Sequence, residues 1–155
     1  VNDLKGIKTE IAIDSEINFN DRALIPENFM PVANERLKVY RSLNDAKSTT
    51  DIHTIFEEIK DRCGKPSEDV LNLVENSKIR VLANKIGIRK IYSNKDTAMM
   101  TFHDSLDDEV YKKLIELIQS GSTGIKLTGA NKLNIDVSNQ ANKREAVSAL
   151  LHQLS

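Results

Sequence analysis

The chain opens with an alternation of apolar and polar positions between residues 7 and 19. One side of this alternation is mostly apolar and consists of Ile7, Thr9, Ile11, Ile13, Ile17 and Phe19. The other side is polar and consists of Lys8, Glu10, Asp14, Glu16 and Asn18. This period of two predicts one or two half-buried strands, bent near Ser15. Residues 23–31 contain Pro26 and Pro31, which lack the amide donor that a central strand needs, so we expect an irregular connector there.

Further along the chain, apolar residues recur at helical spacing. This spacing predicts five helices, at about residues 32–46, 50–63, 67–86, 107–120 and 139–153. The second of these helices follows the capping candidates Thr49 and Thr50 and is expected to end at Gly64.

Two strand pairs separate the last helices. The first predicted hairpin joins strands at 88–93 and 97–103 through a turn at 94–96, and the second joins 124–128 to 132–137 through residues 129–131. Strands pair locally and do not alternate one-for-one with helices. The sequence therefore predicts an α+β fold, with two antiparallel hairpins and an N-terminal strand packed against about five helices.

Composition restricts the class of protein. Of 155 residues, 39% are apolar and 29% charged, and no apolar run approaches the roughly 20 residues of a membrane span. No secretory signal is recognisable, and a single cysteine fits a reducing compartment.

The net charge is −1 with both signs interspersed, and aromatics make up 5%, so we expect no direct nucleic-acid binding. The chain starts at Val1, which suggests a piece of a larger protein.

Cys63 lies between Arg62 and Gly64, a setting that resembles an activated nucleophile. At helical spacing, however, it shares one stripe with four apolar residues: Ile52, Ile55, Phe56 and Ile59. It also falls at the C-terminal end of the predicted helix, where the helix dipole disfavours a thiolate. We therefore interpret Cys63 as part of the core.

The other side of the same helix is charged. Glu58, Asp61 and Arg62 are spaced by three and four residues, so they cluster away from the apolar stripe. From the spacing alone, this cluster can be a solvated surface with a Glu58–Arg62 pair contributing about 0.3–0.5 kcal/mol. The alternative interpretation is a polar contact surface for another domain.

Catalysis finds little support in the sequence. Candidate residues for an enzyme are His53, His103, His152, Asp51, Asp104 and Cys63. Only His103 and Asp104 are adjacent, and neighbouring residues of a strand point to opposite faces. No spacing matches a zinc site. We predict no catalytic, metal-binding or cofactor-binding residues.

Four segments together resemble a known family. They are Leu24-Ile25-Pro26-Glu27-Asn28-Phe29-Met30-Pro31, then Glu35-Arg36-Leu37 with Tyr40-Arg41, then Glu58-Ile59-Lys60-Asp61-Arg62-Cys63-Gly64, and Leu82-Ala83-Asn84-Lys85-Ile86-Gly87-Ile88. Their ordered series is similar to the C-terminal domain of bacterial transcription-repair coupling factors over residues 9–155, with residues 1–8 as a linker or domain edge. The family usually has Phe at the position of Cys63, which agrees with the core interpretation.

This resemblance implies a function. The family's parent proteins are cytoplasmic, ATP-driven DNA translocases that bind double-stranded DNA, displace stalled RNA polymerase and recruit UvrA for nucleotide excision repair. ATP and Mg belong to their motor domains, and the phosphate-binding motif is missing here because Gly121-Ser122-Thr123-Gly124 lacks the lysine.

By resemblance, the terminal domain is regulatory and non-catalytic. It docks on the UvrB-homology module and masks the UvrA-binding surface, with docking residues that correspond to Glu58, Asp61 and Arg62. A generic module that binds another chain is the alternative.

Overall fold

The computed structural model describes residues 14–104, 106–120, 124–129 and 131–155. The first described strand, β1 (Glu16–Asn18), leads through an irregular connector to three helices in succession: α2 (Ala33–Asp45), α3 (Thr49–Cys63) and α4 (Glu68–Ile86). The connector at 23–31 is confirmed, and the predicted strand pattern is confirmed for Ile17 and Phe19, which face the core. The rest of that pattern, residues 7–13, lies outside the described residues.

The second half of the chain contains both predicted hairpins. The first joins β2 (Ile88–Ser93) to β3 (Thr97–Phe102), and the second joins β4 (Ile125–Leu127) to β5 (Lys132–Asp136). Helix α5 (Asp108–Gln119) lies between the hairpins in sequence, and α6 (Lys143–Leu154) closes the chain. The α+β class is confirmed.

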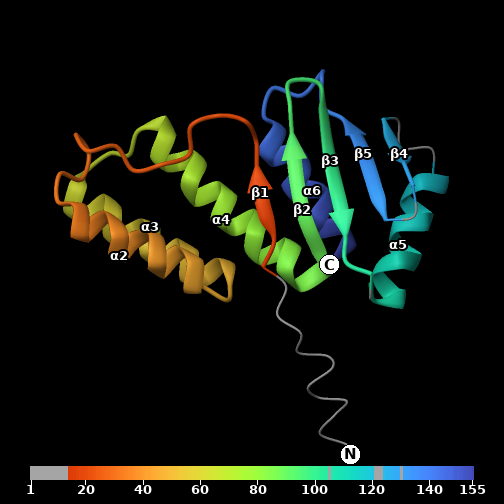
Figure 1. Ribbon diagram of the computed structural model, residues 1–155, viewed down its shortest axis with the longest axis horizontal. Coiled ribbons are helices and arrows are strands. Elements are labelled where there is room, and N and C mark those ends of the chain that lie inside the picture. Colours follow the sequence, from red (N-terminus) through yellow and green to blue (C-terminus); the bar gives the residue numbers. More distant parts are fainter. Residues whose placement is uncertain (1–13, 105, 121–123, 130) are drawn as a thin grey trace, which may run out of the picture.

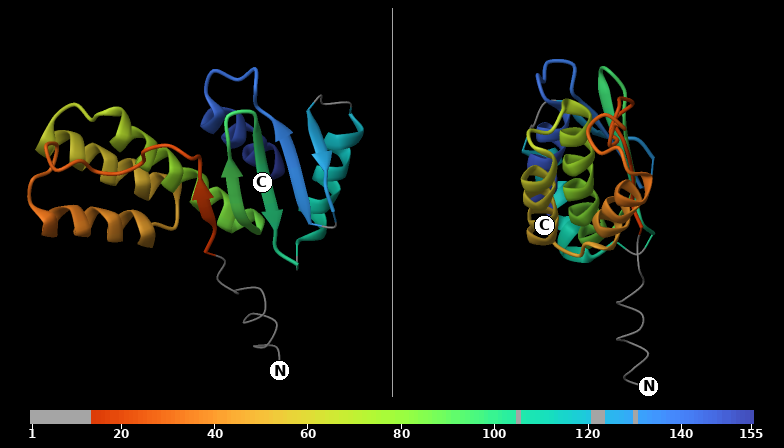
Figure 2. Two further views of the ribbon diagram at one scale, coloured as in Figure 1. Left: turned by 45° about the horizontal axis from the view of Figure 1, so that its top comes forward. Right: turned by 90° about the vertical axis from the view of Figure 1, so that its left-hand side faces the viewer.

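All the described strands form one sheet, in the order β1-β2-β3-β5-β4. The neighbouring pairs are antiparallel except β1 and β2, which run parallel with Ile17 opposite Ile91. Figures 1 and 2 show α6 and the second half of α4 behind one face of this sheet, while α2, α3 and the first half of α4 lie beyond its β1 edge. We call α2, α3 and the first half of α4 the helical lobe, and the remainder the sheet lobe.

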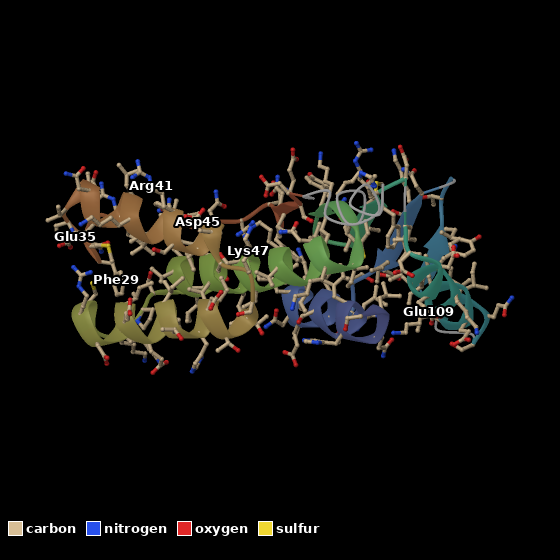
Figure 3. All side chains as sticks on the ribbon, turned by 90° about the horizontal axis from the view of Figure 1, so that it is seen from below. Phe29, Glu35, Arg41, Asp45, Lys47 and Glu109 are labelled. Atoms are coloured by element: carbon tan, nitrogen blue, oxygen red, sulfur yellow. The ribbon has the colours of Figure 1, made fainter. Side chains whose placement is uncertain are left out.

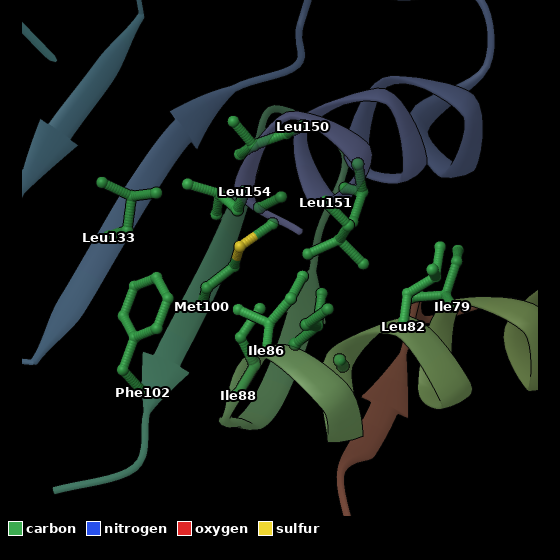
Figure 4. Packing of buried hydrophobic residues seen from close by; sticks show 14 of the residues in the cluster. Ile79, Leu82, Ile86, Ile88, Met100, Phe102, Leu133, Leu150, Leu151 and Leu154 are labelled. Atoms are coloured by element: carbon green, nitrogen blue, oxygen red, sulfur yellow. The ribbon is translucent and has the colours of Figure 1, made fainter. Parts of the chain in front are cut away.

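Each lobe has its own core. In the sheet lobe, Met100 and Phe102 of β3 pack against Leu150, Leu151 and Leu154 of α6, as Figure 4 shows. In the helical lobe, a second cluster contains buried residues from the connector and three helices, among them Met30, Val39, Leu43, Ile52, Ile59, Val70 and Val74. Helix α4 contributes to both clusters, because Val70 and Val74 face the helical lobe whereas Ile79 and Ile86 face the sheet lobe.

Two polar contacts tie β1 and the chain that follows it to the helices. The Ser15 hydroxyl contacts Asn84 of α4 and the carbonyl oxygen of Ile88, which fixes the start of β1. Further along, the Arg144 guanidinium donates to both carboxylate oxygens of Asp21, at 2.8 and 2.5 Å. Its Nε donates to Asn76 of α4 at 2.7 Å, so α6, α4 and the residues after β1 meet at one point.

Two helix boundaries differ from the sequence-based expectation. Helix α3 is capped by Ser48, not by Thr49 or Thr50, and the Ser48 hydroxyl accepts a hydrogen bond from the amide of Asp51 at 3.1 Å. Helix α6 begins at Lys143 instead of about residue 139, because the Asn142 side chain caps it by accepting from the amide of Glu145.

A charged face on the helix that ends at Gly64

The candidate site lies on α3, whose two faces have different environments. Ile52 and Ile59 are buried in the helical lobe, with exposed fractions of 0% and 3%. Cys63 packs half-buried against the same cluster, so it fills apolar space at the edge of the core without being fully enclosed. Because this apolar stripe fixes the rotation of the helix, the residues on the opposite side of α3 face outward.

Glu58, Asp61 and Arg62 are all exposed on the outward face of α3. We call these three residues the docking face, after the role that the sequence resemblance implies for them. The structure brings them together as the helical spacing predicted. Gly64 ends the helix with φ +87° and ψ −157°, a conformation that residues with a side chain rarely adopt, so the chain turns away directly after the docking face.

Arg62 has a different partner from the one that the spacing suggested. Its Nη2 lies 3.0 Å from Oε1 of Glu35 on α2, so the guanidinium pairs across to the neighbouring helix instead of with Glu58. Figure 3 shows Glu35 at the end of the molecule remote from the sheet. The sequence did not indicate Glu35 as the partner of Arg62, because no local spacing rule relates residues on two different helices.

A small pocket borders the docking face between α2 and α3. It has a volume of about 130 Å³, and its lining combines charged and apolar side chains: Met30, Glu35, Lys38, Val39, Ser42, Ile55, Glu58, Ile59 and Arg62. Met30, Val39 and Ile59 are buried and form its inner wall, whereas Lys38, Glu58 and Arg62 are exposed at its rim. The pocket therefore connects two residues of the docking face, Glu58 and Arg62, to side chains of α2.

A second charged pair lies beside the docking face on α3. Lys60 Nζ lies 2.6 Å from a carboxylate oxygen of Glu57 and 4.7 Å from the centre of the Phe56 ring. The hydrogen bond from Lys60 lowers the pKa of Glu57 below its ordinary value. These contacts occupy Lys60 and Glu57 within the helix, whereas Glu58 and Asp61 form no ion pair within the described part of the chain.

The residues considered for catalysis are spread over the fold. His53 lies on α3, His103 follows β3, and His152 lies on α6. Within the described residues, no group of three or more His, Cys, Asp or Glu side chains could hold a metal ion. The same part of the chain has no helix that is long and apolar enough to cross a membrane.

Comparison with known proteins identifies the family. The TRCF domain model matches residues 19–114, which include the connector, all three helices of the helical lobe and the first hairpin. The chain belongs to the TRCF domain family. The docking face on α3 lies within the matched region.

Curated relatives carry the name transcription-repair-coupling factor. The chain is 27% identical to the one from Escherichia coli strain K12 over 143 residues, which is 90% of this chain and 12% of that protein. It is 32% identical to the one from Buchnera aphidicola over 114 residues, which is 72% of this chain and 14% of that protein. The chain thus spans about an eighth of the length of these relatives.

A solved structure agrees with this fold. The crystal structure of the C-terminal domain of a transcription-repair coupling factor superposes with a TM-score of 0.75 at 18% identity, covering 94% of both chains. At that identity, the likeness shows the fold. The sequence resemblance to this C-terminal domain is confirmed.

Proposed function

We propose that this chain is the non-catalytic autoregulatory domain of a transcription-repair coupling factor. In the resting parent protein it docks on the UvrB-homology module and masks the UvrA-binding surface there. The observation that carries this proposal is the docking face: two carboxylates and a guanidinium lie exposed on α3, while the opposite stripe of the helix is buried. The domain itself uses no cofactor, and ATP, Mg and double-stranded DNA are bound by the motor domains of the parent.

The chemistry of this face suits a contact that must be released. Exposed ion pairs contribute about 0.2–1 kcal/mol each, and desolvation offsets much of the Coulomb attraction at an interface. Such contacts favour one orientation and one partner without producing high affinity. Because both modules belong to one polypeptide, the tether supplies an effective concentration that makes weak docking sufficient.

Release requires a ligand that favours the undocked state. A shift from 1:99 to 99:1 needs about 5.5 kcal/mol of differential binding. Contacts of the parent with RNA polymerase, DNA and nucleotide supply this free energy in the proposed mechanism. UvrA binding then follows from release of the domain.

Charge reversal in the full-length coupling factor tests the proposal. Glu58→Lys with Asp61→Lys replaces attraction by repulsion at the docking face, so we expect UvrA affinity and ATPase activity to rise above resting levels. The control is Asp104→Lys with Glu116→Lys, which makes the same change of charge at exposed positions of the sheet lobe. If UvrA binding stays at its resting level in the docking-face variant, the proposal is wrong.

A docking experiment separates this function from a general protein-binding role. The 155-residue domain and the isolated UvrB-homology module are mixed, and their association is measured at low and physiological ionic strength. We expect salt-sensitive binding that the docking-face variant loses and the control variant retains. Binding only to proteins other than this module supports the alternative, a domain that serves another chain.

A further inference from the structure

A groove of the domain lies on helix faces that the docking face does not include. It has a volume of about 710 Å³ and runs between α4 and α6. Its α4 wall consists of Glu68, Leu71, Asn72 and Glu75. Its α6 wall consists of Asn142, Arg144, Glu145, Ser148, Ala149 and His152. We call this space the α4–α6 groove.

The two walls share one geometry. On α4, the lining residues from Glu68 to Glu75 fall at i, i+3, i+4 and i+7, and on α6 the residues from Glu145 to His152 have the same spacing. Each set therefore forms a straight stripe along its helix. Two stripes of this kind, on packed helices, bound a trough whose length matches about two helical turns.

The middle of the groove is suited to close approach. Ser148 and Ala149 are the central residues of the α6 stripe, and their short side chains leave space above the helix backbone. On the facing stripe Leu71 is 43% exposed, which leaves a large aliphatic side chain in contact with solvent. Helices pack at an interaxial distance of about 8–10 Å, which short residues at the contact allow.

Charge defines the occupant. Glu68 lies on one wall and Glu145 on the other, and the described residues include no cation paired with either carboxylate. Glu75 is paired with Lys78 at 3.3 Å. Arg144, the one arginine of the lining, is already engaged by Asp21 and Asn76, so its charge is compensated from within the fold. The groove consequently presents uncompensated negative charge on both rims, around a centre where Leu71 and Ala149 are apolar and Asn72 and Ser148 are polar.

We infer that the α4–α6 groove binds an amphipathic α-helix with an apolar stripe flanked by lysine or arginine. The apolar side chains of the helix cover Leu71 and the short residues of α6, and its cations face Glu68 and Glu145. Recognition of an amphipathic helix in a groove of this kind uses anchors at i, i+3, i+4 and i+7. The partner is thus a helical, basic segment of a protein, and this surface is independent of the docking face.

The test uses the 155-residue domain and a synthetic peptide. The probe is a fluorescent 14-residue helix with leucines on one face and lysines at its flanks, and its binding is followed by anisotropy at about 50 mM salt. Two matched peptides serve as controls, one with every lysine replaced by glutamate and one with two central prolines that prevent a helix. We expect only the helical basic peptide to bind.

Variants assign the binding to the groove. Glu68→Lys with Glu145→Lys is expected to weaken peptide binding at least tenfold, and Ser148→Trp to abolish it by filling the trough. The control pair Asp104→Lys with Glu116→Lys is expected to bind within about twofold of the unmodified domain. If a reversed-charge variant fails to fold, Glu68→Gln with Glu145→Gln replaces it, with a smaller expected loss.

Several results would overturn the inference. These are the absence of binding by the basic helix, equal binding of the proline peptide, or an equal loss in the control pair. Equal binding of the proline peptide would show that the surface attracts any polycation. We also expect the amide NMR signals of α4 and α6, but not those of α3, to shift on peptide addition. This pattern would place the bound peptide in the α4–α6 groove.

Discussion

Arg62 of α3 forms an ion pair with Glu35 of α2, with 3.0 Å between Nη2 and Oε1. Both side chains are partly exposed, at 57% and 39%, so solvent screens their attraction. We expect a double-mutant cycle with Glu35→Gln and Arg62→Gln to give a coupling free energy of about 0.2–1 kcal/mol in urea unfolding. A coupling well above this range would mean that the pair is a main support of the helical lobe.

The same pair bears on docking. Glu35 holds the Arg62 guanidinium over the pocket between α2 and α3, so Glu35→Gln leaves Arg62 free to move. On the proposed docking role, we expect this variant to change the affinity for the UvrB-homology module while leaving the melting temperature close to that of the unmodified domain. Lys65→Gln, which alters an exposed charge just beyond α3, is the matched control and should change neither quantity.

Glu57 should titrate at a lower pH than an ordinary glutamate. The hydrogen bond from Lys60 stabilises the carboxylate and lowers the pKa of Glu57. The small contribution of Glu57 to folding stability is therefore present above the unfolded-state pKa. That contribution disappears as the pH falls through the lowered folded-state pKa. We expect Lys60→Gln to return the pKa of Glu57 toward its ordinary value in a carboxyl-carbon NMR titration. An unchanged titration curve in this variant contradicts the assigned cause.

Ile52 anchors α3 to the helical core with 0% exposure. Truncation to alanine removes buried apolar area and leaves a cavity, so Ile52→Ala should lower the free energy of unfolding by about 2–5 kcal/mol. Leu37→Ala is the control, because Leu37 is 51% exposed and its loss should cost within about 0.5 kcal/mol. Chemical denaturation followed by circular dichroism measures both. Similar losses in the two variants would contradict the assignment of Ile52 to the core.

Gly64 separates the docking face from the next loop. Its φ of +87° and ψ of −157° lie in a region that is essentially restricted to glycine, although an added Cβ would meet no atom within 4 Å. Gly64→Ala should therefore cost about 1–3 kcal/mol through backbone strain alone. Lys65→Ala should have little effect. A neutral Gly64→Ala result would show that this turn can relax without cost.

The helices and hairpins were predictable because each depends on local spacing. Residues 67–86 carry a long helical period and a glycine at its end, and α4 is observed at Glu68–Ile86. The cap of α3 was not predictable, since Ser48, Thr49 and Thr50 are all capping residues and the local sequence alone does not choose among them. In the structure, the carboxylate of Asp51 accepts a hydrogen bond from the amide of Lys47, and the amide of Asp51 donates one to the Ser48 hydroxyl. These two contacts make Ser48 the cap.

Long-range features escaped prediction for a different reason. The parallel pairing of β1 with β2 depends on Ser15 and Asn84, which are 69 positions apart and become neighbours only when α4 packs on the sheet. The same holds for Glu35, which reaches Arg62 through the packing of α2 on α3. The clustering of Glu58, Asp61 and Arg62, by contrast, follows from the period of a single helix, whereas their docking role is implied only by the resemblance.

Helix α4 contributes side chains to both hydrophobic clusters, and Arg144 joins it to α6 and to the residues after β1. Helix α4 therefore spans both lobes, and the docking face on α3 is joined to the sheet through the packing of α3 on α4. In the proposed mechanism, this shared helix makes the docking face and the α4–α6 groove move together when the domain undocks. Any helix held in that groove would be carried to a new place each time the domain undocks.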